Sequence, residues 1–193
     1  TNITLENPLE LEVIKLTQID PTCYNYADGF AEVTINGGTA PYIYLWSDLL
    51  EQTTADAIEL ISGNYKCTVT DINGCSDSTS FLLENPIEIE VFATIQDILC
   101  FGASEGSISV NVENAIESYE IFWQEDANDS IFIDNLTAGV YHVTVIDGNS
   151  CTKTDSILVN QTAEMVINYT AYPSSCKDIE DGVIEINNIY GGT

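Results

Sequence analysis

Hydrophobic and polar residues alternate along short stretches of this chain, with a period of two residues. Leu9, Leu11 and Val13, for example, alternate with glutamates, a pattern typical of a β-strand with one buried and one solvated face. Between such stretches lie the words NGG, SGN, DING and DGNS, in which glycine or asparagine can adopt positive φ in a turn. No stretch keeps the helical period of 3.6 residues long enough to predict a helix.

The alternating stretches occur in the same order twice. LENPLELEV at residues 5–13 returns as LENPIEIEV at 83–91, and GNYKCTVTDINGC at 63–75 returns as GVYHVTVIDGNSC at 139–151. Short strands at this spacing predict an all-β sandwich. The residues that we expect to face inward are Leu9, Leu11, Val13, Ala31, Val33, Ile35, Tyr42, Tyr44, Trp46, Tyr65, Cys67, Val69, Phe81 and Leu83, and in the second copy Ile87, Ile89, Val91, Ile108, Val110, Val112, Tyr119, Ile121, Trp123, Tyr141, Val143, Val145, Ile157 and Val159.

Repeats of this kind define the predicted domain organisation. Residues 7–84 and 85–160 are expected to form two complete sandwiches. Residues 1–6 are expected to be the last strand of a preceding repeat, and residues 161–193 the first part of a following one. Because the sequence opens in the middle of this pattern, we interpret it as an internal piece of a longer protein.

Charge excludes several function classes. The chain carries a net charge of −27, with 31 acidic residues against four lysines and no arginine, so its surface would repel nucleic acids and anionic membranes. No apolar run approaches the roughly 18 residues of a membrane span, and membrane insertion is not expected. The regular spacing of the 45% hydrophobic residues argues against disorder.

Four of the six cysteines occupy matching positions in the two repeats, and we predict the disulfides Cys23–Cys75 and Cys100–Cys151. Cysteines that follow a small-domain repeat are typical of secreted proteins, although reduced thiols in the cytosol are the alternative. Cys176 repeats the position of Cys23, and its partner would lie beyond residue 193. A zinc site is not favoured, since the chain has no CxxC motif.

Cys67 belongs to a different class from the other cysteines. It follows Tyr65 by two residues, as the second cysteine of immunoglobulin-type domains follows their tyrosine corner. The second repeat has Val143 in its place, so we expect Cys67 to be a small buried hydrophobic residue, and neither a bridge nor a nucleophile.

Catalysis is not predicted. The single histidine, His142, lies on the outward face of its expected strand and is replaced by Lys66 in the first repeat. The acidic residues are expected to form a solvated surface.

Calcium is the one cofactor to which the turns point. The candidate ligands are Asp28, Asp71, Asp147 and Asp181, because hard oxygen ligands in turns suit this ion. The alternative is that these aspartates accept hydrogen bonds from nearby backbone N–H groups.

The words VTINGGTAPYIYLWS, LISGNYKCTVTDINGC and LLENP together resemble the SprB repeat of gliding-motility adhesins from Bacteroidetes. The resemblance covers 7–84 well and 85–160 moderately, and reaches only the opening of the pattern in 161–193. It implies tandem immunoglobulin-like (PKD-like) sandwiches in a very large, extracellular cell-surface protein exported by the type IX system, with no catalytic residues. Three short words also resemble the O-glycosylation acceptor used in this phylum, at Ser78, Ser130 and Ser156.

The function expected from this resemblance is that of a structural or adhesive stalk segment, serving gliding motility or surface attachment. Its expected partners are neighbouring repeats of the same chain, an external surface or polysaccharide, and components of the motility machinery in the cell envelope. Two alternatives stay open. One is a calcium-dependent carbohydrate- or ligand-binding module, supported by the aromatic residues Tyr24, Tyr26 and Tyr172 near the repeated cysteines; the other is an accessory domain of a secreted hydrolase.

Overall fold

The computed structural model describes residues 9–116, 118–125 and 129–192, all of whose regular structure is β-strand. The chain divides into two compact units, Thr1–Glu88 and Ile89–Thr193. Within the described ranges there is no helix of the length and hydrophobicity needed to cross a membrane. The strand expected at residues 1–6 lies outside the described residues.

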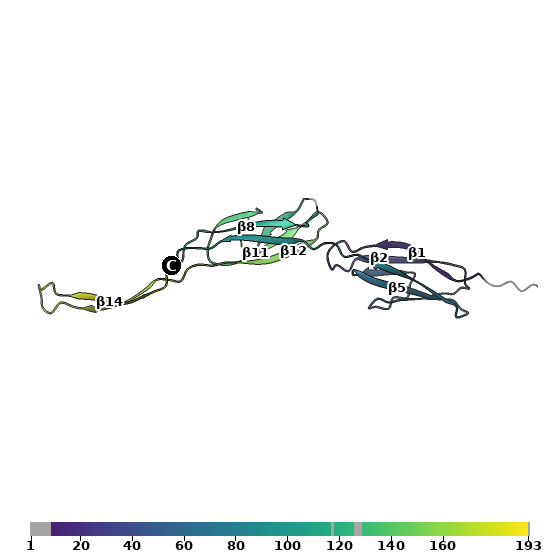
Figure 1. The fold of residues 1–193 in the computed structure, drawn as a ribbon, viewed down its shortest axis with the longest axis horizontal. Helices are drawn as coiled ribbons and strands as arrows, with labels where there is room; N and C mark the ends of the chain where they lie inside the picture. Colours follow the sequence, from purple (N-terminus) through teal and green to yellow (C-terminus); the bar gives the residue numbers. More distant parts are fainter. Residues whose placement is uncertain (1–8, 117, 126–128, 193) are drawn as a thin grey trace, which may run out of the picture. The chain divides into compact units, whose positions relative to one another are not determined.

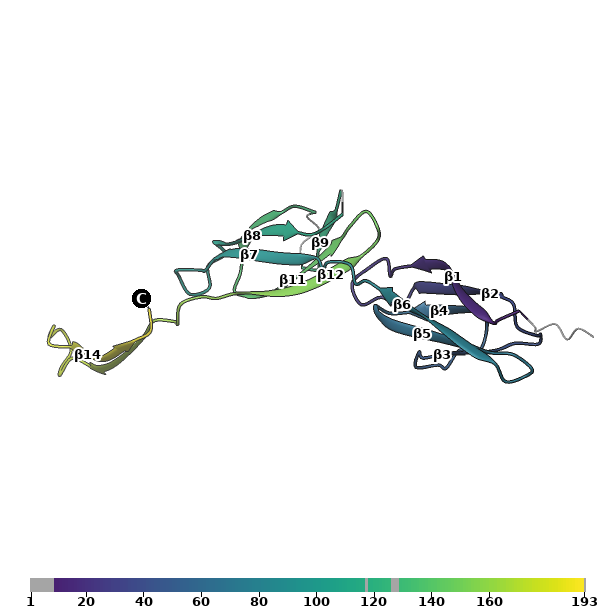
Figure 2. The ribbon, with the colours of Figure 1, turned by 45° about the vertical axis from the view of Figure 1, so that its right-hand side comes forward.

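The first unit is a sandwich of two antiparallel sheets. One sheet has the order β1-β2-β4 and the other β3-β5-β6, and Figure 2 shows the two on opposite sides of this unit. This is the constant-type immunoglobulin arrangement without its fourth strand on the first sheet. The strands are β1 (Glu12–Ile19), β2 (Gly29–Asn36), β3 (Ile43–Trp46), β4 (Asp56–Leu60), β5 (Gly63–Thr70) and β6 (Ser76–Leu83).

The second unit repeats this topology, with one sheet in the order β10-β8-β7 and the other in the order β12-β11-β9. Figure 1 labels β8 of the first of these sheets and β11 and β12 of the second. A two-stranded hairpin, β13-β14, is formed by the residues expected to open a third repeat. The strands are β7 (Glu90–Gln96), β8 (Gly106–Glu113), β9 (Glu120–Trp123), β10 (Phe132–Leu136), β11 (Gly139–Ile146), β12 (Thr152–Val159), β13 (Val166–Tyr172) and β14 (Val183–Tyr190).

A tryptophan occupies the centre of each core. Trp46 is 1% exposed, and its ring centroid lies 5.5 Å from that of Phe81 on the other edge of the same sheet. Its indole Nε1 donates to the Thr54 carbonyl at 2.9 Å, so the only polar group of the buried ring has an acceptor. The core around it draws residues from both sheets of the first unit: Val13, Ala31, Val33, Ala57, Leu60, Cys67, Val69, Phe81 and Leu83.

The second unit copies this arrangement. Trp123 is buried, and its Nε1 donates to the Ser130 carbonyl at 2.9 Å. Each unit also has a tyrosine corner, in which Tyr65 and Tyr141 donate their hydroxyls to backbone carbonyls four residues upstream. The strand pattern that the sequence predicts around the two tryptophans is therefore confirmed as an all-β fold.

Strands β4 and β10 were not predicted from the sequence, because their buried residues do not alternate. Ala57 and Leu60 are buried but lie three positions apart, and Glu59 between them has a φ of 55°. A residue in this conformation adds an extra position to the strand, and the pairing register of β2 with β4 shifts there. In β10 the residue at the same place, Asn135, has a φ of 57°.

Three residues that we expected to face inward are exposed: Leu9, Ile87 and Tyr119. Leu9 is 77% exposed and Ile87 is 76% exposed, and both precede the first strand of their repeat, β1 and β7. Tyr119 is 37% exposed and lies just before β9. The alternation is right for the following residues, Leu11 and Ile89, which are buried.

Replacing Trp46 by alanine should lower the unfolding free energy of the first unit by about 3–5 kcal/mol, because the cavity left between two thin sheets cannot close. Urea unfolding followed by far-ultraviolet circular dichroism would show this change, while the fluorescence of Trp123 should report an unchanged transition of the second unit. The control is Leu45→Ala in the same strand, since Leu45 is 51% exposed and its loss should change stability by about 0.5 kcal/mol or less. An equal loss of unfolding free energy in both units would contradict the prediction that the two cores are independent.

Candidate functional site

Buried aspartates organise one end of each unit. Asp71, in the β5–β6 turn, accepts hydrogen bonds from the backbone N–H groups of Asn73 and Cys75 at 2.9 Å through Oδ1. Its Oδ2 accepts from the Thr39 N–H at 3.0 Å and so joins this turn to the β2–β3 loop. We call this the upstream end of the unit, because the chain enters β1 here: the Gly38 N–H donates to the Leu9 carbonyl.

The second unit has the same turn. Asp147 accepts from the N–H groups of Asn149 and Cys151 at 2.9 Å through Oδ1, and from the Ile116 N–H at 3.2 Å through Oδ2. The carboxylate is buried, as in the first unit. One aspartate thus satisfies three backbone donors in both copies of the turn, which is the arrangement expected of a structural residue.

The pKa of Asp71 is set by competing effects. Burial disfavours the charged form, but hydrogen bonds from the N–H groups of Cys75, Thr39 and Asn73 outweigh it and lower the pKa. The stability that this carboxylate contributes is therefore present above the ordinary aspartate range and is lost as the pH falls through the lowered pKa.

The other two candidate ligands, Asp28 and Asp181, each hold a short loop. Asp28 lies between β1 and β2, and Asp181 lies between β13 and β14. Asp28 accepts from the Thr22 hydroxyl and from the Thr22 N–H, and these two bonds lower its pKa. Asp181 accepts from the Ser175 hydroxyl and N–H in the same way, again with a lowered pKa. The structure therefore gives all four calcium candidates local hydrogen-bond donors, which is the alternative that the sequence left open.

These aspartates do not come together. In the described part of the chain, no group of three or more histidine, cysteine, aspartate or glutamate side chains is placed to hold a metal ion. Calcium binding at Asp28, Asp71, Asp147 and Asp181 stays a prediction that solution measurements must test.

Several further aspartates have fixed partners that the sequence did not indicate, among them Asp48 and Asp77. Asp48 is buried and accepts from the N–H groups of Leu50 and Gln52 and from the Gln52 amide, so that it shapes the loop after β3. Asp77 accepts from the Val13 N–H at 2.8 Å, across the gap between β6 and β1. Sequence offered no signal for Asp77, because its partner lies 64 positions away.

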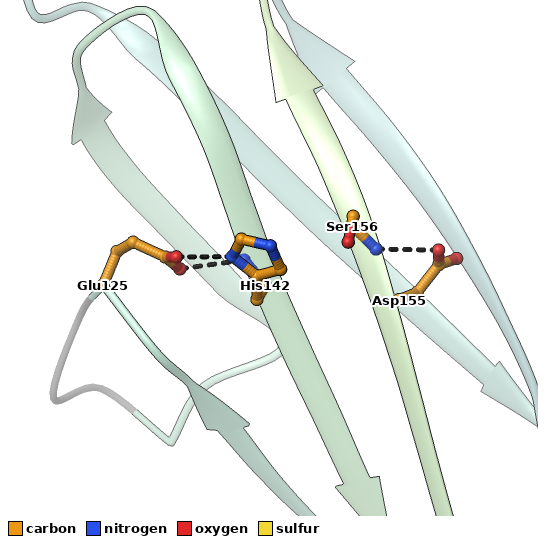
Figure 3. A network of polar contacts seen from close by, with 4 residues as sticks. All are labelled: Glu125, His142, Asp155 and Ser156. Carbon is orange, nitrogen blue, oxygen red and sulfur yellow. Dashed lines mark hydrogen bonds and ion pairs between the residues drawn. The ribbon is translucent and has the colours of Figure 1, made fainter.

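His142 contacts a glutamate on the surface of the second unit. Its Nδ1 lies 2.6 Å from Glu125 Oε1, and its backbone N–H donates to Glu125 Oε2 at 2.8 Å (Figure 3). The backbone bond from His142 and then the ring contact lower the pKa of Glu125. The two contacts hold the segment after β9 against β11. The role of this solvent-exposed pair is therefore structural.

The predicted glycosylation serines differ in exposure. Ser156 is exposed on β12, and its N–H donates to the neighbouring Asp155 carboxylate in Figure 3. Ser78 and Ser130 are half-buried, and the Ser130 hydroxyl accepts from the Phe132 N–H. Modification at these three positions stays a prediction.

The cysteines do not pair as predicted. Cys75 and Cys100 are exposed free thiols, so the bonds Cys23–Cys75 and Cys100–Cys151 are not formed. Cys23 and Cys151 are disulfide-bonded, and Cys176 is an exposed thiol.

The geometry of each unit explains this correction. Cys75 lies at the upstream end, whereas Cys23 lies in the β1–β2 loop at the other end, where Asn25 and Asn85 exchange hydrogen bonds. The eight residues of β6 span the unit between these two ends, a distance of about 25 Å. A disulfide needs Cα atoms about 4.4–6.8 Å apart, so Cys23 cannot reach Cys75 within one folded unit.

Cys67 lies at the centre of the first core as a free, fully buried thiol. Burial raises its pKa to about 11. The thiol is therefore protonated at neutral pH and packs as a small apolar side chain, like Val143 in the second unit.

The family model of the SprB repeat matches residues 16–50 and 92–128. The chain contains SprB repeats. The two matches fall at corresponding places: each begins inside the first strand of a unit and covers the strand after it and the tryptophan. SprB is an adhesin-associated repeat, typically without catalytic activity.

Two solved structures that contain several immunoglobulin domains show limited likeness to this chain. The N-terminal eight immunoglobulin domains of Down Syndrome Cell Adhesion Molecule match with 13% identity and a TM-score of 0.37, covering 80% of this chain and 25% of that one. Immunoglobulin domains 1–5 of Sidekick-1 match with 8% identity and a TM-score of 0.33, covering 86% and 42%. No curated protein matches the chain significantly.

Acid should destabilise the first unit in a way that depends on Asp71. From pH 7 down to about 5 the urea midpoint reported by Trp46 fluorescence should hold, and below about pH 4 it should fall as the carboxylate protonates. Asp71→Asn should lower the midpoint at pH 7 and flatten the acid decline. Glu10→Gln, at an exposed position of the same end, is the control and should change neither feature. An unchanged midpoint in Asp71→Asn would contradict the structural role.

Removal of calcium should leave both units unchanged, since their turn carboxylates are already engaged by backbone donors. We expect the melting curve to be the same in millimolar calcium and in excess EDTA. A stabilisation by calcium that disappears in Asp71→Asn or Asp147→Asn would instead establish an ion at that turn.

Proposed function

We propose that the chain is a non-enzymatic structural segment of a large repetitive cell-surface adhesin, serving gliding motility or surface attachment. Such a segment must transmit tension from one repeat to the next without unfolding. The observation that supports this role is the contact between the first and last strands of each unit.

In the first unit, β1 and β6 run side by side in the same direction. The Val13 N–H donates to Asp77 Oδ2 near their starts, and the Glu84 N–H donates to Asp20 Oδ1 at 3.0 Å just beyond their ends. The Gln18 amide donates to the Leu82 carbonyl between them. Each pair is separated by 64 positions, which is the constant offset of a parallel alignment.

The second unit has the same contact between β7 and β12, formed here by the backbone beyond the strand ends. The Ile98 N–H donates to the Asn160 carbonyl at 2.9 Å, and the Thr162 N–H donates to the Ile98 carbonyl at 3.2 Å, so that Ile98 and Gln161 form a parallel bridge. Asp97 Oδ1 accepts from the Asn160 N–H at 2.9 Å.

Tension applied through the neighbouring repeats would enter at the start of the first strand and leave at the end of the last. Because these strands are parallel, such a pull slides one along the other and loads their cross-links together. Unfolding then requires several bonds to break at once, which raises the barrier to forced unfolding. The −27 net charge adds mutual repulsion that opposes clumping, within about 8 Å at physiological salt.

Pulling single molecules by their ends tests this proposal. With all cysteines kept reduced, we expect two unfolding events, each releasing about 20–25 nm of chain from the extended length of its residues. Asp97→Ala should lower the force of one event only, since it removes the carboxylate that holds Asn160. The matched control is Glu120→Ala, an exposed acidic residue on β9. Equal forces for these two variants would contradict a tension-resisting contact.

A ligand-binding module is the rival function, and it makes a different prediction. Tyr24 and Tyr26 are about half exposed on the β1–β2 loop and could stack on a sugar ring. A glycan array probed with the chain, in the presence and absence of EDTA, should show no binding if the role is structural. Specific binding that is lost in Tyr24→Ala would favour the rival.

A further inference from the structure

Two free cysteines of the first unit lie on one hairpin, in opposite environments. Cys67 is in β5 and is fully buried in the hydrophobic core. Cys75 is in the turn that joins β5 to β6, and it is exposed. The two residues are eight positions apart in the sequence. The hairpin therefore holds one accessible thiol and one that solvent does not reach.

The pairing of β5 with β6 keeps these two thiols apart in the folded unit. Cys67 pairs with Thr79, whereas Cys75 lies at the turn, where its carbonyl accepts from the Asp71 N–H. Cys75 is thus four positions from the level of Cys67, which is about 14 Å of extended strand. A disulfide needs Cα atoms about 4.4–6.8 Å apart, so the two cysteines cannot bond while the hairpin is intact.

The core also protects Cys67 chemically. Trp46 pairs with it from β3, so the thiol and the indole are cross-strand neighbours in the core. Burial raises the pKa of Cys67 to about 11, whereas a cysteine of an unfolded chain titrates near about 8.5. Because the thiolate is the nucleophile in disulfide exchange, Cys67 becomes reactive only when the core opens.

A cavity beside Cys75 has room for a small disulfide molecule. Its volume is about 920 Å³, and its lining includes Cys75 together with the carboxylates of Glu10, Glu12 and Asp77. The pKa of Asp77 is lowered, chiefly by the hydrogen bond from the Val13 N–H, so this carboxylate is charged at neutral pH. The negative lining favours an entering disulfide that carries ammonium groups, such as cystamine, over an anionic one.

The second unit offers an internal comparison. Its turn has Cys151 at the position of Cys75, but β11 has Val143 at the position of Cys67. Val143 is fully buried, as Cys67 is. The same strand of the same fold is therefore built with an aliphatic residue, and packing alone does not require a thiol at position 67.

We propose that Cys67 and Cys75 form a redox latch, a disulfide that closes only after the first unit has unfolded and that then prevents this unit from refolding. The bond holds the two Cα atoms within about 6.8 Å, whereas the native register separates them by about 14 Å. The core around Trp46 cannot reassemble until a thiol reduces the bond. This inference goes beyond the proposed stalk role, because any cause of unfolding closes the latch.

Closure takes two thiol–disulfide exchanges. In the folded unit, the Cys75 thiolate attacks one sulfur of a low-molecular-weight disulfide, forms a mixed disulfide and releases one thiol. After unfolding, the Cys67 thiolate attacks Sγ of Cys75 and releases the second thiol. The two protein thiols thereby lose two electrons and two protons, which leave with the two small thiols.

The short spacing selects this pair in the unfolded chain. The next free thiol after Cys75 is Cys100, which is 33 positions from Cys67. Loop-closure entropy favours the eight-residue loop over that one by roughly eightfold.

Oxidation of the whole chain in its folded and unfolded states tests the proposal. The chain is incubated with cystamine and cysteamine, in buffer or in urea above the unfolding midpoint, then acidified and cleaved before aspartates without reduction for mass spectrometry. In buffer we expect cysteamine on Cys75 and an unmodified Cys67. In urea we expect a peptide pair joined by Cys67 and Cys75. This bond in the folded chain, or Cys67 joined mainly to another cysteine in urea, would overturn the proposal.

Refolding measures the latch itself. After oxidation in urea and dilution into buffer, hydrogen exchange should show β5 unprotected, and dithiothreitol should restore its protection. Cys67→Val, which copies the second unit, should regain β5 protection without a reductant, and so should Cys75→Ser at its exposed position. Circular dichroism under reducing conditions first establishes that both variants fold. Protection of β5 in the oxidised wild-type chain, or its loss in oxidised Cys67→Val, would count decisively against the latch.

Discussion

A buried indole holds together the two thin sheets of each unit. With three strands to a sheet, a small sandwich covers little apolar surface, so one side chain large enough to contact both layers contributes much of the core. Burial of the indole also requires an acceptor for its N–H group, and the carbonyls of Thr54 and Ser130 meet this requirement. These carbonyls lie just before β4 and β10, so each tryptophan is hydrogen-bonded to the segment that leads into the fourth strand of its unit.

The strands that the sequence revealed are those whose buried residues alternate. In β2 the residues Ala31 and Val33 are buried, and in β5 the residues Cys67 and Val69 are buried, so that buried positions alternate with more exposed ones. The fourth strand could not be recognised in the sequence, because Glu59 and Asn135 adopt positive φ and the buried residues on either side of them are three positions apart. This departure from the period of two depends on backbone conformation, and composition does not disclose it.

The functional side chains were predictable only where their partners are local. Asp71 bonds within its own turn, so the DING motif already suggested hydrogen bonding to the backbone. Asp77 and Asp97 act across strands that are distant in the sequence, and no local signal marks them. The matching positions of the cysteines in the two repeats also suggested a bond between Cys23 and Cys75. In the structure Cys23 precedes β2 and Cys75 precedes β6. The two strands run in opposite directions, a fact that only the sheet topology provides.

The aspartate turns at Asp71 and Asp147 have the same bonds, and so do the tyrosine corners that follow β4 and β10. A gene that gains or loses one whole unit would therefore leave each remaining unit with its own turn, corner and core. Unequal recombination could add or remove such units without redesigning any of these elements. The length of the encoded chain would then change in steps of one sandwich.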